Sequence, residues 1–233
     1  MKLDVLQRLN AARQKRRAAI AVTDLATGHV RVVLEAEGYD ADPLAAELRR
    51  RFASGASGTF AEANTFLTVH LPPPRLIVIG AVHISQALAP MARLAGFDMT
   101  IVDPRTAFAT PDRFPDVALM AEWPEDAIPK LGLDPFTALA ALTHDPKIDD
   151  GPLAAALRAG CFYVGALGSR KTQAKRHERL RALELDERQV ARIRGPIGLP
   201  IGAQSPAEIA VSILAEVIQA LRSRGVAANE AAA

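Results

Sequence analysis

A glycine-led loop between two short apolar runs holds the first residues that could bind a ligand. Gly80-Ala81-Val82-His83 follows the run Leu76–Ile79, and Asp103 follows a second run, Met99–Val102, about twenty residues further on. In dinucleotide-binding proteins such a loop offers N–H groups to phosphate, and an acid at this distance binds a ribose hydroxyl. The pattern predicts a site for a phosphorylated ligand, with the candidate residues Gly80, Ala81, His83, Asp103 and Arg105.

The loop departs from the usual G-x-G-x-x-G fingerprint at its third position. Val82 stands where a second glycine would let a diphosphate approach the backbone. The helix that follows still offers free N–H groups and a positive dipole end. We therefore expect the loop to suit an anion better than ordinary NAD. His83 has two interpretations: it donates to a ligand oxygen, or it hydrogen-bonds the backbone and fixes the turn.

A second polar loop, Thr143–Asp150, follows a later apolar run. It contains a histidine, three carboxylates and a lysine. His144 and Asp145 could supply ligand contacts or a proton-transfer pair at the end of a strand. The same residues also fit a capped turn before a helix, and the sequence leaves both interpretations open.

A third loop, Gly165–Thr172, runs from an apolar strand through small residues into a predicted helix. Small residues allow a ligand to approach the backbone, Ser169 can cap the helix, and Arg170 and Lys171 supply positive charge. This pattern predicts a second anion site. Its candidate residues are Gly165, Gly168, Ser169, Arg170 and Lys171.

Basic residues continue along the helix after this loop, at Lys175, Arg176, Arg179 and Arg181. Such a run could touch nucleic acid or an acidic protein, but no aromatic residues interleave with it as a stacking platform requires. The net charge of +2 also demands no polyanionic partner. We therefore expect a solvated helix face and no nucleic-acid ligand.

The sequence offers no recognisable catalytic apparatus. Cys161 is the only cysteine, which excludes an internal disulfide and a cysteine-cluster metal site. It lies at the entry to an apolar strand, where we expect a buried, inert thiol rather than a nucleophile. No serine-histidine-aspartate spacing or nucleophile elbow is present. We assign no catalytic residue and no metal ligand, and leave open whether the chain is an enzyme.

The elements that must position these loops alternate between short apolar runs and helical segments. This alternation predicts an α/β fold: a doubly wound, mostly parallel, Rossmann-like sheet with its ligand at the carboxyl ends of the strands. The predicted strands are Leu76–Ile79, Met99–Val102, Val117–Met120, Ala138–Leu142 and Phe162–Ala166. The predicted helices include 84–95, 151–157, a weaker one near Ala127, and one opened by the capping box Ser205-Pro206-Ala207-Glu208.

The residues before Pro72-Pro73-Pro74 predict a smaller α+β domain. They comprise a basic helix from Leu3 to about Arg17, a hairpin of Ala18–Val22 and Val30–Leu34, a helix from Asp42 as N-cap to Phe52, and a strand, Phe66–Leu71. Consecutive prolines interrupt regular structure, so they place the domain boundary. We expect domains at residues 1–72 and 75–224 and a flexible tail at 225–233.

Nothing in the sequence points to a membrane or to export. No apolar stretch reaches eighteen residues, and the N-terminal residues lack the continuous apolar region of a signal peptide. A single cysteine is consistent with a reducing compartment. We therefore expect a cytoplasmic protein with no membrane span.

Five segments together resemble the C-terminal domain of the XdhC/CoxI family, the accessory proteins of xanthine dehydrogenase and related molybdenum hydroxylases. They are GAVHISQALAPMARLAGF, TIVDPR, THDPKID, YVGALGSRKT and PIGLPIGAQSPAEIAVSILAE, in the family's order. The resemblance implies a chaperone rather than a catalyst. It would bind molybdenum cofactor (molybdopterin) as transient cargo, assist its sulfuration by a cysteine desulfurase, and pass it to the apo-enzyme. It also implies a homodimer.

The chain departs from the family pattern in two places. Many members have Gly-Ala-Gly-His at the loop where this chain has Val82. Full-length members also carry a Gly-Ser-x-Pro-Arg stretch and a Ser-Gly-Gly-Cys motif in an N-terminal domain, and residues 1–74 have neither. The resemblance therefore implies a shortened N-terminal domain and a separate protein that supplies the missing motif.

Two alternatives to the carrier remain. In an NAD(P)-dependent oxidoreductase, Asp103 would bind the ribose and Arg105 would accept a 2′-phosphate. In a ligand-free scaffold of the maturation machinery, the fold would be kept and the ligand lost.

Overall fold

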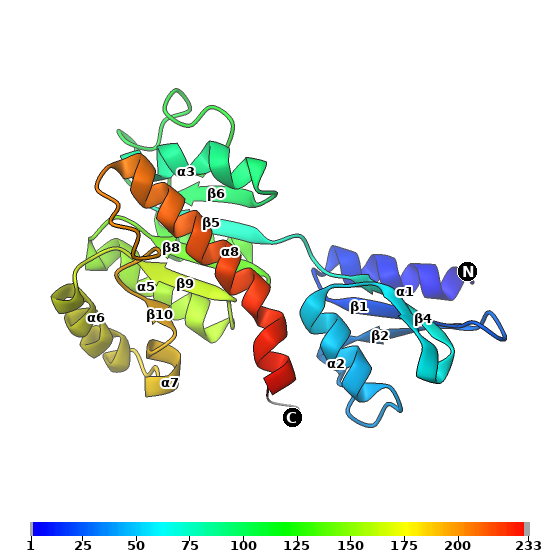
Figure 1. The fold of residues 1–233 in the computed structure, drawn as a ribbon. Helices are drawn as coiled ribbons and strands as arrows, with labels where there is room; N and C mark the ends of the chain where they lie inside the picture. Colours follow the sequence, from blue (N-terminus) through cyan, green and yellow to red (C-terminus); the bar gives the residue numbers. More distant parts are fainter. Residues whose placement is uncertain (1, 231–233) are drawn as a thin grey trace. The chain divides into compact units, whose positions relative to one another are not determined.

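The computed structural model describes residues 2–230 of the chain (Figure 1). Two compact units are distinguished. One groups Met1–Pro72 with Arg222–Ala233, and the other is Pro73–Leu221. The division after Pro72 coincides with the proline run. At the other end the second unit stops at Leu221, three residues before the end of the predicted domain at 224.

The first unit contains a four-stranded antiparallel sheet in the order β2-β1-β4-β3. Its strands are β1 (Ala19–Asp24), β2 (Val30–Leu34), β3 (Gly58–Phe60) and β4 (Thr65–His70). Its helices are α1 (Leu3–Gln14) and α2 (Ala45–Ser54), with 3₁₀ turns at Glu35–Glu37 and Ala61–Ala63. The predicted hairpin is confirmed, because β1 and β2 pair antiparallel with Ala19 opposite Leu34. The strand β3 was not predicted, since its three residues carry no apolar alternation.

The predicted start of the second helix is wrong. Asp42 is not its N-cap: α2 begins at Ala45, and Asp42 instead accepts a hydrogen bond from the N–H of Leu44 at 2.9 Å. The carboxylate of Asp42 also binds the guanidinium of Arg31, at 2.5 and 2.8 Å. An ion pair with the sheet therefore holds this aspartate in a turn before the helix.

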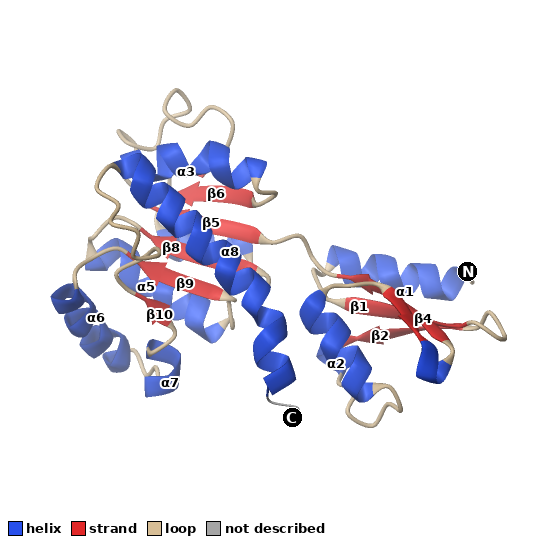
Figure 2. Cartoon of the chain, viewed as in Figure 1, coloured by secondary structure: helices blue, strands red, loops and turns tan. Residues whose placement is uncertain are grey.

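The second unit is built on a six-stranded parallel sheet in the order β10-β9-β8-β5-β6-β7 (Figure 2). Read from the other edge, this is the 3-2-1-4-5-6 order of the Rossmann fold, so the predicted fold class is confirmed. The strands are β5 (Arg75–Ile79), β6 (Asp98–Val102), β7 (Ala118–Met120), β8 (Thr137–Ala141), β9 (Tyr163–Ala166) and β10 (Ile193–Arg194). The two-residue strand β10 was not predicted.

Helices cover both faces of this sheet, as a doubly wound fold requires. They are α3 (His83–Leu94), α4 (Pro124–Leu131), α5 (Pro146–Arg158), α6 (Arg170–Ala182), α7 (Glu187–Val190) and α8 (Pro206–Glu230). Alternate residues of β5 point to opposite faces. Val78 packs in a cluster with Leu88 of α3 and Ile213 of α8, whereas Ile77 packs in a second cluster with Leu153 of α5.

Two predicted features of the C-terminal region differ in outcome. The capping box that opens α8 is confirmed: the N–H of Ser205 donates to Glu208, and the N–H of Glu208 donates to Ser205. Residues 225–230, part of the predicted flexible tail, continue α8, and the flexibility itself stays a prediction. Residues 231–233 lie outside the described part of the chain.

Over the described residues, none of the helices combines the length and the hydropathy needed to span a membrane.

Candidate functional site

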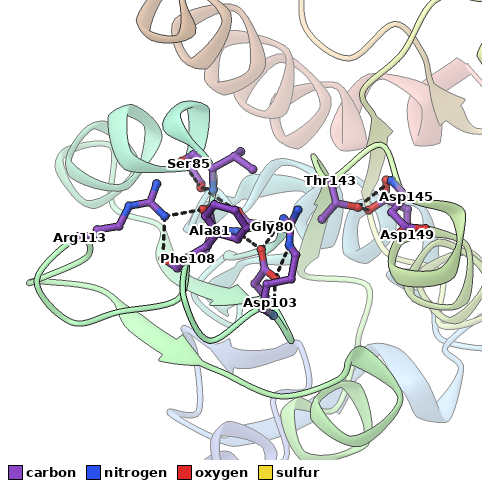
Figure 3. A network of polar contacts seen from close by, with 11 residues as sticks. Gly80, Ala81, Ser85, Asp103, Phe108, Arg113, Thr143, Asp145 and Asp149 are labelled. Carbon is purple, nitrogen blue, oxygen red and sulfur yellow. Dashed lines mark hydrogen bonds and ion pairs between the residues drawn. The ribbon is translucent and has the colours of Figure 1, made fainter.

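The candidate site lies at the carboxyl end of β5, where the strand order of the parallel sheet reverses. β5 pairs with β6 on one side and with β8 on the other, so the segments after these three strands meet at one edge of the sheet. This is the position at which open α/β sheets bind their ligands. Figure 3 shows the polar contacts made there.

Gly80 brings the loops after β5 and β8 into contact. Its φ of +121° lies in a region that side-chain-bearing residues rarely adopt. A Cβ atom at this position would lie 3.0 Å from Cγ2 of Thr143 and 3.4 Å from the backbone N of the same residue. The predicted loop glycine is therefore required both by its backbone conformation and by the close approach of Thr143.

Asp103 is fully buried, and both its carboxylate oxygens are occupied. Oδ2 accepts from the N–H of Ala81 at 2.7 Å and from Nη2 of Arg105 at 2.7 Å. Oδ1 accepts from the backbone N and Nε of Arg105, each at 2.9 Å. Burial by itself would raise the pKa of Asp103, but the hydrogen bonds from Arg105 and Ala81 outweigh it and lower that pKa. Asp103 holds the loop and the arginine, and presents no free oxygen to a ribose.

The second N–H of the loop is also satisfied internally. The N–H of Val82 donates to Oγ of the buried Ser85 at 2.8 Å, and that hydroxyl lies 2.8 Å from the carbonyl oxygen of Gly80. With the N–H of Ala81 bound to Asp103, the loop itself leaves little for a phosphate. The first N–H groups of α3, beginning with His83, have no acceptor within a helix. They are the backbone donors that an anion could reach.

Beside these donors lies a pocket of about 380 Å³. It is lined by Ala81, Val82, His83, Arg105, Ala107, Phe108 and Arg113. The ring of Phe108 is 46% exposed, with the guanidinium carbon of Arg105 4.8 Å from its centroid and that of Arg113 5.8 Å away. His83 is exposed at the rim. We call this the Arg113 pocket.

The charge of Arg113 has no carboxylate partner among residues 2–223, whose side chains the structure describes. Its Nη1 donates to the carbonyl oxygens of Ala81 at 3.1 Å and Phe108 at 2.8 Å (Figure 3). Its Nη2 donates to Oε1 of Gln86 at 3.0 Å. These neutral partners fix the guanidinium without cancelling its charge. Arg105, in contrast, is neutralised by Asp103, with Nη1 as its remaining nitrogen. The pocket is therefore prepared for an anion.

The loop after β8 caps a helix and holds a buried acid. The side chain of Asp145 accepts from the N–H of Lys147, which makes it the N-cap of α5, and His144 is exposed with a φ of +64°. The capped-turn interpretation is confirmed, and a ligand contact from His144 or Asp145 stays a prediction. Oγ1 of Thr143 donates to Oδ1 of Asp149 at 2.7 Å (Figure 3).

Asp149 is fully buried, and its Oδ2 has no hydrogen-bond partner within the described residues. Burial raises the pKa of this carboxyl to about 6, against the lowering effects of the Thr143 hydrogen bond and the charge of Arg176. The hydrogen bond to Asp103 is the main cause that raises the pKa of Arg105, and the charges of Asp145 and Asp149 add smaller contributions. The two sides of the crevice therefore interact electrostatically.

The residues of the predicted second anion site, in the loop after β9, differ in burial. Gly165 is buried, and a Cβ there would lie 2.5 Å from the Tyr163 hydroxyl and 2.7 Å from Ile197, so close packing requires a glycine at this position, while a ligand contact stays a prediction. Gly168 has a φ of +133°, and Ser169 accepts from the N–H of Thr172 as the predicted cap. Arg170 and Lys171 are exposed. This loop lies two strands, roughly 10 Å, from β5.

The predicted solvated face of α6 is wrong for Arg176, whereas Arg179 stays partly exposed and forms an ion pair. Arg176 is only 2% exposed, and it donates to the side chain of Gln173 and the carbonyl oxygen of Leu167. Arg179 donates to the carboxylate of Asp150 at 2.5 and 3.1 Å. Arg176 thus ties α6 to the loop after β9 and Arg179 ties it to α5, roles that charge periodicity alone does not reveal.

Comparison with known proteins identifies the fold family. Residues 76–217 match the XdhC Rossmann domain, which is more than half of the chain. The chain belongs to the XdhC family. The XdhC match spans all the predicted site residues, from Gly80 to Lys171, as well as the Arg113 pocket.

Curated relatives share about a third of their aligned residues with this XdhC chain. Over 67% of the chain it is 34% identical to the uncharacterized protein YqeB of Escherichia coli (strain K12) and to a probable xanthine dehydrogenase subunit of Bacillus subtilis (strain 168). It is 31% identical, over 66% of the chain, to the molybdenum cofactor insertion chaperone PaoD of Escherichia coli (strain K12). The matches cover 29%, 46% and 42% of these relatives, so the chain spans less than half of each.

A solved structure resembles both units. A protein from Bacillus halodurans, described as a xanthine dehydrogenase, is 26% identical with a TM-score of 0.69. The likeness covers 95% of this chain and 68% of that one.

Sequence reasoning missed the pocket residues Phe108 and Arg113. The segment Arg105–Phe114 contains two arginines and two phenylalanines directly after a strand that ends at the ligand edge. That composition was the available signal. The sequence analysis also missed the contact between Thr143 and Gly80. This contact depends on the pairing of β5 with β8, which no local sequence pattern indicates.

Proposed function

We propose that this chain is an accessory protein that binds molybdenum cofactor and assists its maturation and insertion into a molybdenum hydroxylase of the xanthine or carbon monoxide dehydrogenase type. Family membership and the names of the relatives support this role. The structural observation that carries the proposal is the uncompensated guanidinium of Arg113 beside the first turn of α3.

The Arg113 pocket fits the chemistry of this cargo. Molybdenum cofactor is a pterin that carries an anionic phosphate. Arg113 supplies charge, Nη1 of Arg105 supplies a further donor, and the first N–H groups of α3 point along the positive end of the helix dipole. We infer that the phosphate lies here, with His83 as a further donor at the rim.

The remaining parts of the proposal concern partners. We propose that the chain acts with the apo-enzyme and with a cysteine desulfurase, and that it is a homodimer in the cytoplasm. Residues 1–74 lack the Ser-Gly-Gly-Cys motif of full-length family members. A separate protein with that domain would therefore supply it.

The test is cargo recovery from the purified chain. The wild type, Arg113→Gln and Arg113→Lys are expressed in a host that makes the cofactor, and released pterin is oxidised and measured by fluorescence. Pterin near one equivalent is expected for the wild type, with at least a tenfold loss in Arg113→Gln and partial recovery in Arg113→Lys, which restores the charge. Arg188→Gln is the matched control, because Arg188 is exposed on α7, outside the pocket.

Two results would overturn the proposal. Recovery of NAD(P) without pterin would establish the oxidoreductase alternative. A wild-type chain that stays empty when the host's cofactor is abundant would favour the ligand-free scaffold.

A further inference from the structure

The Arg113 pocket is larger and less polar than a phosphate site needs. Besides its two guanidinium groups it has the half-exposed ring of Phe108 and the apolar side chains of Val82 and Ala107. A volume of about 380 Å³ lies within the range of small-molecule sites. Its lining therefore suits a flat ring joined to an anion.

The position of the pocket in the fold indicates which kind of flat ring it would bind. The lining segment 105–113 follows β6, so the pocket lies on the β6 side of the switch point and not on the β8 side. In the Rossmann fold the residues after this strand contact a nucleoside, whose phosphate lies at the N-terminus of the first helix. Here that helix is α3, and its first residue, His83, lines the same pocket.

The pocket lacks the carboxylate contact that usually binds a ribose. The acid that would bind the ribose diol, Asp103, has both oxygens filled by Ala81 and Arg105. Recognition must then come from the ring, stacked on Phe108 or on a guanidinium plane, and from the phosphate. Both kinds of stacking are well known for nucleobases.

Hydrogen bonds within the chain hold both guanidinium groups of the pocket in place. Three hydrogen bonds hold Arg105 to Asp103, and Arg113 donates to Ala81, Phe108 and Gln86. Pre-ordered donors lower the entropy cost of binding.

We propose that the Arg113 pocket is a nucleoside-phosphate subsite that ignores the ribose 2′-hydroxyl. This proposal rests on the proposed function, which supplies the ligand: the nucleotide of a nucleotide-extended pterin. A free mononucleotide is the alternative source of the same chemistry. The base stacks at Phe108, and the phosphate lies between Arg113, Nη1 of Arg105 and the first turn of α3.

The test is calorimetric titration of the full chain, freed of cargo, with CMP, dCMP, GMP, cytidine and inorganic phosphate. CMP and dCMP should bind within twofold of each other, because Asp103 does not contact the ribose. Cytidine and phosphate should each bind at least tenfold more weakly than CMP. Phe108→Ala should weaken CMP about tenfold, within the range for loss of one base stack. Leu94→Ala is the matched control, an 85% exposed apolar side chain on α3.

Three outcomes decide the subsite separately from the carrier role. A tenfold preference for CMP over dCMP would overturn the binding mode, because it requires a ribose contact. Binding of CMP no tighter than phosphate, in a chain that still recovers pterin, would overturn the subsite and leave the carrier role standing. CMP binding that depends on Phe108, in a chain that never recovers pterin, would support the subsite and remove the carrier role. Mass spectrometry of native cargo distinguishes a nucleotide-extended pterin from a free mononucleotide.

Discussion

The backbone N–H of Ala81 donates a 2.7 Å hydrogen bond to Oδ2 of Asp103, although 22 positions separate the two residues. A loop amide that would ordinarily face a phosphate is thereby turned toward the acid that would ordinarily face a ribose. The same carboxylate fixes Arg105. Asp103, which would bind a ribose in the usual dinucleotide arrangement, instead holds Ala81 and Arg105 in place beside the Arg113 pocket.

Asp103→Asn should destabilise the chain by about 2 to 3 kcal/mol, because it removes charge-assisted hydrogen bonds and leaves Arg105 without its counter-ion. An amide nitrogen would also face one of the donors that Asp103 now accepts. Chemical denaturation monitored by circular dichroism measures the change. The matched control is Asp98→Asn at the start of β6, which is exposed and should change stability by less than about 0.5 kcal/mol. Equal effects of the two changes would contradict the structural role of Asp103.

Asp149 should make stability depend on pH in mildly acid solution. Its pKa in the folded chain, about 6, lies above the ordinary value of 3.8, so the folded chain holds the proton more tightly than the unfolded chain does. Ionisation of Asp149 therefore costs the folded chain stability. This cost is absent below about pH 4, grows as the pH rises toward 6 and is complete above it, reaching about 3 kcal/mol. Asp149→Asn mimics the neutral acid and should not have this penalty.

The measurement is the free energy of unfolding of wild type and Asp149→Asn from pH 4 to 7. The difference between them isolates this carboxyl, because Asp150 and Arg176, the charged groups that act on it, are present in both chains. The variant should gain in relative stability as the pH rises. A difference that is flat across this range would show that Asp149 is ionised normally.

Gly165→Ala should destabilise the chain by about 1 to 3 kcal/mol, because the added methyl group would overlap the Tyr163 hydroxyl and the side chain of Ile197. The control is Gly151→Ala within α5, where the nearest atom to an added Cβ is 3.9 Å away. That change should stabilise the chain by about 0.5 to 1 kcal/mol, since alanine is the better helix former. Thermal unfolding of both variants tests the packing role, and an unaffected Gly165→Ala would refute it.

Cys161 should not react with thiol reagents in the native chain at pH 8. Its side chain is fully buried, and burial raises the pKa of the thiol to about 12, so almost no thiolate forms. A disulfide-exchange reagent such as dithionitrobenzoate should label one thiol per chain only after unfolding in guanidinium chloride. Stoichiometric labelling of the native chain within minutes would mean that the site opens readily.

The sequence by itself determined the fold class, because period and composition are local properties. Unbroken apolar runs such as Leu76–Ile79 are too short for helices and apolar enough for strands buried on two faces, and glycines mark where the strands end. The caps at Ser169 and Ser205 were readable for the same reason: each acts within four residues of its own position. The short strand β10 lacked such a signal.

Only the tertiary structure decided how the site is used. Asp103 and Arg105 were visible as candidates, but a sequence does not show that every oxygen of the acid is already occupied. Arg113 reaches the pocket because the segment after β6 packs against α3, and Arg176 is buried because α6 packs against α5. These outcomes depend on strand order and helix packing, which bring together residues far apart in the chain. Sequence periodicity, in contrast, reports only the local structure of neighbouring residues.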